Sequence, residues 1–169
     1  SMPLTDEWAE RLANTSRAVV LVDTEHPSFE SFSVDSKHGG YEATKHLIDL
    51  GYERIGHITV AYNPPPARFR REGYEQALRD SGRTVDEALI AASDERPFAF
   101  SEEGGYRAMK KLLERDSPPD AVFAGSDMQA LGAMRAAQEA DLRVPEDLAL
   151  IGFDDIELSR CAGLTTIRQ

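Results

Sequence analysis

Short apolar runs alternate with segments of helical periodicity along most of this chain. The apolar runs cover 54–60, 88–92, 121–125 and 148–153. The 148–153 run is continuous and does not alternate with polar residues, so it predicts a strand that is covered on both faces; strands are also expected over the other three segments. Between them, apolar residues recur at helical spacing over 66–81, 102–114 and from Ser126 onward. Strand and helix units with short joints predict right-handed crossovers, and hence an α/β fold with a doubly wound parallel sheet.

The beginning of the chain continues the alternation in a shorter form. We expect a short amphipathic helix over Leu4–Leu12, a buried strand over Ala18–Asp23, and an extended segment over Phe32–Asp35. Gly39-Gly40 is then predicted to open a helix that Gly51 closes as a left-handed cap. The inward face of this helix is predicted to carry Ala43, Leu47 and Leu50.

The strongest single signal is the segment from Val144 to Asp155. A turn with Pro145 precedes the apolar run, and Asp154 and Asp155 follow it directly. In parallel sheets, ligands meet the protein at the carboxyl ends of the strands. The two acids therefore lie where a ligand is expected.

Other chemically useful side chains follow the other strands. Arg70 comes after the 54–60 run, Phe100 after 88–92, and Ser126 after 121–125, so all should share one sheet edge with Asp154. A guanidinium, an aromatic ring, a hydroxyl and a carboxylate around one crevice suit a small polyhydroxylated or otherwise polar ligand.

Each of these residues also has a purely structural interpretation. Ser126 with Gln129 fits a helix capping box, and Asp127 would favour a helix N-terminus. Phe100 could be simple core, and Arg70 could be a surface charge beside Arg68 and Arg71. Arg71, one step round the helix, is expected to face solvent. Spacing by itself leaves these alternatives open.

Composition narrows the class of protein. With 169 residues and 41% hydrophobic content, the chain can form one sizeable core, or one core plus part of another. Its net charge of −11 would repel nucleic acid phosphates and anionic membranes, so the segment should not bind DNA by itself. The single cysteine, Cys161, excludes an internal disulfide and fits a reducing, cytoplasmic compartment. No membrane span or secretory signal is visible, and Ser1-Met2 is typical of a cloning remnant, so we expect an excised piece of a longer protein.

Signatures of enzymes and metal sites are absent from the sequence. There is no nucleophile elbow, dinucleotide fingerprint or phosphate-binding loop, and no pair of acids stands out by its spacing. The histidines show no metal-ligand spacing and are interpreted as loop or packing residues: His26, His38, His46 and His57. We therefore expect neither catalysis nor a cofactor.

Several motifs together resemble the effector-binding domain of LacI/GalR transcriptional repressors. The motifs, in order, are Arg70-Arg71-Glu72-Gly73-Tyr74, Ser126-Asp127-Met128-Gln129-Ala130-Leu131-Gly132-Ala133, Val144-Pro145-Glu146-Asp147 running to Gly152-Phe153-Asp154-Asp155, and Leu164-Thr165-Thr166-Ile167-Arg168-Gln169. The resemblance covers nearly the whole chain, and its specificity comes from the order and spacing of the motifs.

The resemblance implies a periplasmic-binding-protein-like fold of two lobes that hold an inducer or corepressor between them. Residues 1–35 would be a remnant of the N-terminal lobe, and 36–169 the C-terminal lobe up to the hinge, with the strand order 88–92, 54–60, 121–125, 148–153 and the last strand, 164–167, at the edge. By motif position, Arg70 and Asp154 match ligand-binding residues of the family. Phe100 falls at an aromatic wall, Ser126 at a polar position, and Asp23 at an acid of the first lobe.

The family resemblance also implies partners. Its members act as homodimers that bind a small effector, such as a sugar or related polar metabolite, and contact operator DNA through an N-terminal helix-turn-helix domain. Two other classes of protein are alternatives. A periplasmic sugar-binding protein would share the fold, but the Leu164–Gln169 ending and the Ser126-Asp127 motif argue against it. In a small α/β enzyme or receiver domain the 54–60 strand should end in acids, whereas it ends in Thr59-Val60-Ala61.

Overall fold

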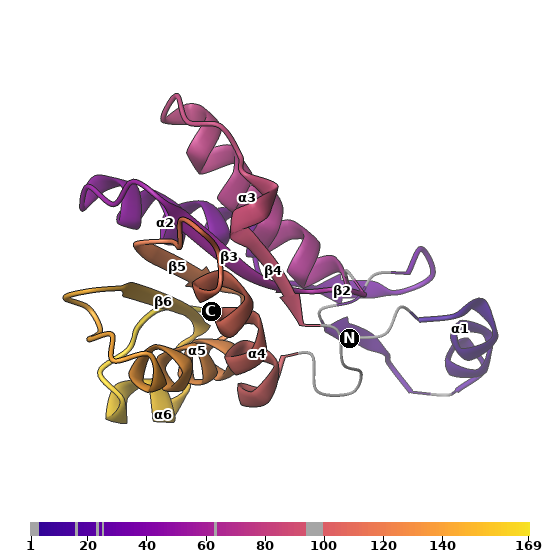
Figure 1. Ribbon diagram of the computed structural model, residues 1–169. Helices are drawn as coiled ribbons and strands as arrows, with labels where there is room; N and C mark the ends of the chain where they lie inside the picture. The colour runs from indigo at the N-terminus through magenta and orange to yellow at the C-terminus, as the bar shows by residue number, and fades with distance from the viewer. Residues whose placement is uncertain (1–3, 16, 23, 25, 63, 94–99) are drawn as a thin grey trace.

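A computed structural model describes residues 4–15, 17–22, 24, 26–62, 64–93 and 100–169. Its elements are α1 (Asp6–Ala13), β1 (Val20–Val22), β2 (Glu30–Phe32), α2 (Ser36–Asp49), β3 (Ile55–Val60), α3 (Pro65–Asp80), a 3-10 turn (Glu87–Leu89), β4 (Ile90–Ser93), α4 (Glu102–Leu113), β5 (Ala121–Ala124), α5 (Asp127–Glu139), β6 (Ala149–Asp154), α6 (Glu157–Cys161) and β7 (Thr165–Arg168). Figure 1 shows α1, β1 and β2 on one side of the larger sheet.

The larger sheet has five parallel strands in the order β4-β3-β5-β6-β7. This is the strand order that the family resemblance implied, with the last strand at the edge. Every residue of β3 and β5 is buried, as expected for central strands of a parallel sheet that is covered on both faces. Their carboxyl ends share one edge, where β6 ends in Asp154 and Gly125 follows β5.

Helices cover both faces of this sheet. On one face, Ala43 and Leu47 of α2 and Tyr74 of α3 pack with Phe123 and Ile151 of the strands. On the other face, side chains of α4 and α5 pack against strand residues that include Ile58, Val122 and Leu150. The predicted doubly wound architecture is confirmed.

The start of α2 differs from the prediction. The helix begins at Ser36, with the Asp35 carboxylate accepting a hydrogen bond from His38 N at 2.9 Å, so Gly39 and Gly40 lie inside it. A Cβ atom at Gly40 would lie 2.3 Å from the carbonyl oxygen of Arg70. Gly40 therefore serves the close approach of α2 and α3, whereas a Cβ at Gly39 would lie 2.5 Å from the Phe153 ring of β6; neither glycine opens the helix.

The end of α2 is partly as predicted. Gly51 adopts a φ of +91° and closes the helix as expected. Leu50, which was expected on the inward face, is 61% exposed. The prediction for Leu50 was wrong because the helix ends before its side chain can reach the sheet, whereas Ala43 and Leu47 are buried as predicted.

The first part of the chain contributes little to the main core. β1 and β2 form a separate two-stranded parallel sheet, and Val20, Val22 and Phe32 are exposed. Among the described residues, no residue before Ser36 belongs to the apolar clusters that surround the five-stranded sheet.

We therefore predict that deleting residues 1–33, which spares the Asp35 cap, leaves the five-stranded unit folded. The free energy of unfolding should change by less than about 1 kcal/mol, because the removed side chains lie outside its core. Urea unfolding followed by circular dichroism checks this. Loss of a cooperative transition in the shortened chain would contradict it.

Candidate ligand-binding site

Arg70 is the centre of the polar cluster at the carboxyl edge of the sheet. It lies on the buried face of α3 and is only 7% exposed. Its Nη1 donates a hydrogen bond of 2.5 Å to the carbonyl oxygen of Gly125, and its Nη2 lies 3.5 Å from the carboxylate of Asp154. The guanidinium also stacks over Phe153, 3.8 Å from the ring centre. A buried cation held in this way by three partners is a rigid group for orienting a polar ligand.

Asp154 reaches this cluster in an unusual backbone conformation. Its φ is +124° and that of Asp155 is +56°. Residues other than glycine rarely adopt positive φ angles. Such backbone conformations cost roughly 1–3 kcal/mol each and occur often at functional sites. The strain turns the chain sharply where β6 ends and leaves the Asp154 carboxylate partly accessible beside Arg70.

Gln169 also belongs to this cluster, although no role was predicted for it from the Leu164–Gln169 motif. Its Nε2 donates to the Asp154 carboxylate. The signal that could have found it is register, because β7 pairs with β6 and places Arg168 opposite Asp154. Arg168 itself donates from Nε to Asp155 at 2.5 Å.

The structure shows Ser126 as a helix cap. Its side chain oxygen accepts a hydrogen bond from Gln129 N at 3.3 Å, and the residue is buried. The Gln129 side chain does not complete a reciprocal capping box, since its Nε2 donates to the carbonyl oxygen of Thr59. The ligand contact predicted for Ser126 stays a prediction.

Asp127 does more than favour a helix N-terminus. It is completely buried, and its carboxylate accepts hydrogen bonds from Ile156 N at 2.9 Å and from the hydroxyls of Ser159 and Thr166 at 2.5 Å each. These bonds tie the start of α5 to the segments on both sides of α6. Asp127 therefore fixes the turn that presents Asp154, a structural role that short-range spacing could not reveal.

Phe100 packs beside a second aromatic residue. Its ring meets Tyr62 edge to face, with the centroids 6.4 Å apart, in a small cluster with Val60 and Ala67. Tyr62 follows β3, so two neighbouring strands each supply one ring near the carboxyl edge. Asp23, the acid predicted from the other lobe, lies outside the described residues.

Arg71 differs from its neighbour and from expectation. It was interpreted as a surface charge, but it is half-buried between two acids, with Nε 2.8 Å from Glu75 and Nη2 2.6 Å from Glu87. Hydrogen bonding to Glu75 is the main reason that the pKa of Arg71 is raised. Arg70 and Arg71 thus extend from α3 in different directions, toward β5 and β6 and toward β4.

His57 is the buried histidine beneath the site. It stacks between Tyr74 and Phe123, with centroid distances of 5.1 and 4.9 Å, and its Nδ1 lies 2.9 Å from the Phe123 carbonyl oxygen, to which it donates. Its Nε2 has no hydrogen-bond partner among the residues that the structure describes. Burial lowers the pKa of His57 to about 4, since nothing at Nε2 compensates a charged ring. The packing role predicted for this histidine is confirmed.

We predict that His57 makes stability depend on pH. Between its folded pKa of about 4 and the unfolded value of 6.5, the unfolded chain binds more protons, so stability falls as pH falls through this window. The loss should approach roughly 3 kcal/mol. Urea titrations from pH 7 to pH 4 test this, with His57→Gln as the control that keeps a donor and removes the titration. Parallel profiles for both proteins would rule the effect out.

The described residues form neither a metal-binding cluster nor a membrane-spanning helix. No cluster of three or more histidine, cysteine or acidic side chains is placed to hold a metal ion. No described helix combines the length and apolar character that crossing a bilayer requires.

The chain is similar to known transcriptional repressors. It is 38% identical over 169 residues to the HTH-type transcriptional repressor PurR of Haemophilus influenzae (strain PittEE), covering 98% of this chain and 49% of PurR. It is 42% identical over 138 residues to the HTH-type transcriptional repressor CytR of Escherichia coli (strain K12), covering 80% of this chain and 39% of CytR. The chain thus spans about half the length of PurR and 39% of the length of CytR.

The fold of the chain is also similar to solved structures of LacI family regulators. A LacI family transcriptional regulator from Enterococcus faecium with bound ribose superposes with a TM-score of 0.86 at 30% identity, covering 98% of this chain and 61% of that one. A sugar-binding LacI family regulator from Escherichia coli, complexed with phosphate, gives a TM-score of 0.81 at 29% identity, covering 95% and 58%. Residues 44–169 also match the periplasmic binding protein-like domain family. The chain therefore belongs to the periplasmic binding protein-like domain family, in the form found in LacI/GalR transcriptional regulators.

Proposed function

We propose that this chain senses a small-molecule effector within a LacI/GalR-type transcriptional regulator. The observation that carries the proposal is the buried Arg70 beside the partly accessible Asp154 at the carboxyl edge of the sheet. A ligand with adjacent donor and acceptor atoms can bond to both groups at once. The effector is a sugar or a related polar metabolite, because the rings of Phe100 and Tyr62 at the same edge suit its less polar face.

The rest of the site extends beyond these residues. Ser126 would approach the ligand from the start of α5, and Asp23 from the N-terminal lobe, to which we assign residues 1–35. The exposed Val20, Val22 and Phe32 support this assignment, because an apolar strand pair needs further strands to cover it. Residues 36–169 form the C-terminal lobe. We propose no catalytic step, since the repressor relatives point to a binding function.

The whole regulator would act in the cytoplasm as a homodimer. The net charge of −11 makes this segment a poor binder of DNA. We therefore assign contact with the operator to a helix-turn-helix domain, because PurR is an HTH-type repressor. Effector binding then changes operator affinity through its different affinity for the two arrangements of the lobes.

The test uses the longer protein with an operator found by in vitro selection of random DNA. Thermal-shift screening of a metabolite library finds the effector, since a ligand at 100 times its dissociation constant adds about 2.7 kcal/mol of stability. Fluorescence anisotropy then measures operator binding at fixed salt with and without that ligand. We expect operator affinity to change at least tenfold. A stabilising ligand that leaves operator affinity unchanged would refute the sensing function.

A further inference from the structure

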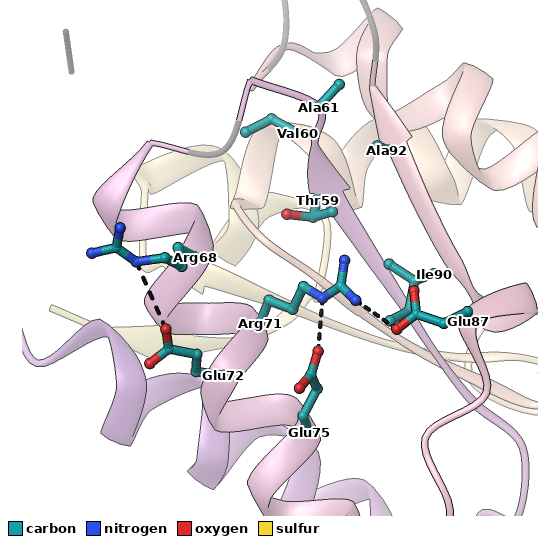
Figure 2. Close-up of a pocket in the computed structure, with 10 residues that line it drawn as sticks. All are labelled: Thr59, Val60, Ala61, Arg68, Arg71, Glu72, Glu75, Glu87, Ile90 and Ala92. Atoms are coloured by element: carbon teal, nitrogen blue, oxygen red, sulfur yellow. Dashed lines mark hydrogen bonds and ion pairs between the residues drawn. The ribbon is translucent and has the colours of Figure 1, made fainter. Parts of the chain in front are cut away.

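A cavity lies on the other flank of α3, away from Arg70. It has a volume of about 490 Å³ and lies between α3 and the edge strand β4, with the end of β3 as its inner wall (Figure 2). Pockets that hold small molecules commonly measure about 300–1,000 Å³. Asp154 and Phe100 do not line this cavity, so it is separate from the proposed effector site.

Arg71 presents one unused edge of its guanidinium to this cavity. Glu75 and Glu87 hold Nε and Nη2 by ion pairs, which fixes the plane of the group. Figure 2 shows Nη1 pointing toward the side where Thr59 lies. Within the described part of the chain, Nη1 has no hydrogen-bond partner. Its protons are therefore available to an acceptor in the cavity.

Thr59 supplies an independent polar group. The residue is only 6% exposed and lines the cavity from β3. Figure 2 shows its hydroxyl directed toward the α3 side of the space. A hydroxyl that faces the cavity can donate one hydrogen bond to a bound group and accept another.

The remaining wall determines which ligand chemistry fits. Ile90 and Ala92 of β4 form an apolar floor. The charges nearly cancel, since two arginines face three glutamates and one of these, Glu75, also pairs with Arg79. A strongly charged ligand would gain little here, whereas hydroxyl groups could accept from Arg71 and Thr59 and donate to Glu87.

We propose that this cavity binds a small neutral polyhydroxylated molecule at a site distinct from the Arg70–Asp154 crevice. The ligand bonds to Arg71 Nη1 and to the Thr59 hydroxyl while its C–H face packs on Ile90 and Ala92. Since Arg70 and Arg71 are consecutive in α3, both sites share one helix.

Nuclear magnetic resonance of the 169-residue chain tests the proposal, with myo-inositol as the probe. We expect saturable shifts of the Thr59, Val60, Ile90 and Ala92 amides, with a dissociation constant in the millimolar range, roughly 1–10 mM. Thr59→Val, which keeps the shape and removes the hydroxyl, should weaken binding at least threefold. The matched control is Thr165→Val, the same change at an exposed position of β7, which should leave binding unaltered.

Two comparisons decide between explanations. Putrescine and inorganic phosphate, as a cation and an anion, should shift these amides less than myo-inositol does at equal concentration. Asp154→Asn should leave the inositol shifts in place, because Asp154 lies outside the cavity. The proposal is overturned if the cavity amides do not respond, if either ion binds better, if Thr59→Val binds normally, or if Asp154→Asn abolishes the shifts.

Discussion

Asp154→Asn in the longer regulator should weaken effector binding at least tenfold and leave operator affinity without effector within about threefold. The exchange keeps the shape of the side chain and removes the charge that faces Arg70. A tenfold loss corresponds to about 1.4 kcal/mol, the scale of one lost charged hydrogen bond. Operator affinity should persist because operator contact is proposed for a separate helix-turn-helix domain, to which neither Asp154 nor Arg70 belongs.

Arg70→Ala should have the same effect on the effector, with an added loss of stability. Truncation removes the stacking on Phe153 and the hydrogen bond to Gly125, so part of its effect is structural. Asp154→Asn therefore carries the test of function if Arg70→Ala folds poorly. Anisotropy titrations of operator with effector at fixed salt measure both.

Matched controls come from the opposite end of the sheet. Arg115→Ala and Asp116→Asn make the same charge changes at exposed positions after α4, and both should keep the normal effector midpoint. Arg71 is unsuitable as a control because it is ion-paired to Glu75 and Glu87. If Arg70→Ala and Asp154→Asn also keep the normal midpoint, their roles are structural only.

Gly73→Ala should destabilise the chain by about 3 kcal/mol or more. A Cβ at this position would lie 2.1 Å from the carbonyl oxygen of Lys37 and 2.6 Å from the backbone nitrogen of Tyr41. Both are backbone atoms of α2, so no side chain rotation can relieve the clash, and the two helices must separate. An added methyl group in a helix otherwise stabilises it by roughly 0.5–1 kcal/mol, so the expected effect has the opposite sign to helix propensity.

Urea unfolding measures this effect, with Gln76→Ala as the control. Gln76 is exposed on the same helix, and its replacement should change stability by less than about 0.5 kcal/mol. Wild-type stability in Gly73→Ala would show that α2 and α3 tolerate a wider spacing. The spacing matters for the site, because Gly40 makes the same kind of approach to the backbone of Arg70.

Local patterning was enough to predict most of the elements. The strand over 148–153 was predicted because full burial requires a continuous apolar run, and strands over 54–60 and 121–125 were predicted from short segments between helices; β6, β3 and β5 lie there. The carboxyl edge followed from the parallel connections, which place the end of β6 beside Gly125. The family motifs added the strand order, which the structure confirms.

Residue roles that depend on contacts between distant parts of the chain could not be predicted from the sequence. Gly39-Gly40 was interpreted as a helix opening. The local sequence of a glycine pair does not distinguish a helix end from a position inside a helix where another part of the chain approaches closely. Arg71 was interpreted as solvent-facing, since its partner Glu87 lies 16 positions away, beyond the reach of helical spacing. Asp127 and Gln169 gained their roles from partners on β6, β7 and α6.

The sequence by itself determined the alternation of strands and helices, the chemistry at the strand ends and the family. The tertiary structure decided which neighbouring arginine enters which environment, how closely α2 approaches α3, and which carboxylate accepts from Ile156, Ser159 and Thr166. The physical reason is the range of the interactions. Periodicity and capping act within a few residues, whereas burial, ion pairing and steric contact depend on atoms that only the folded chain brings together.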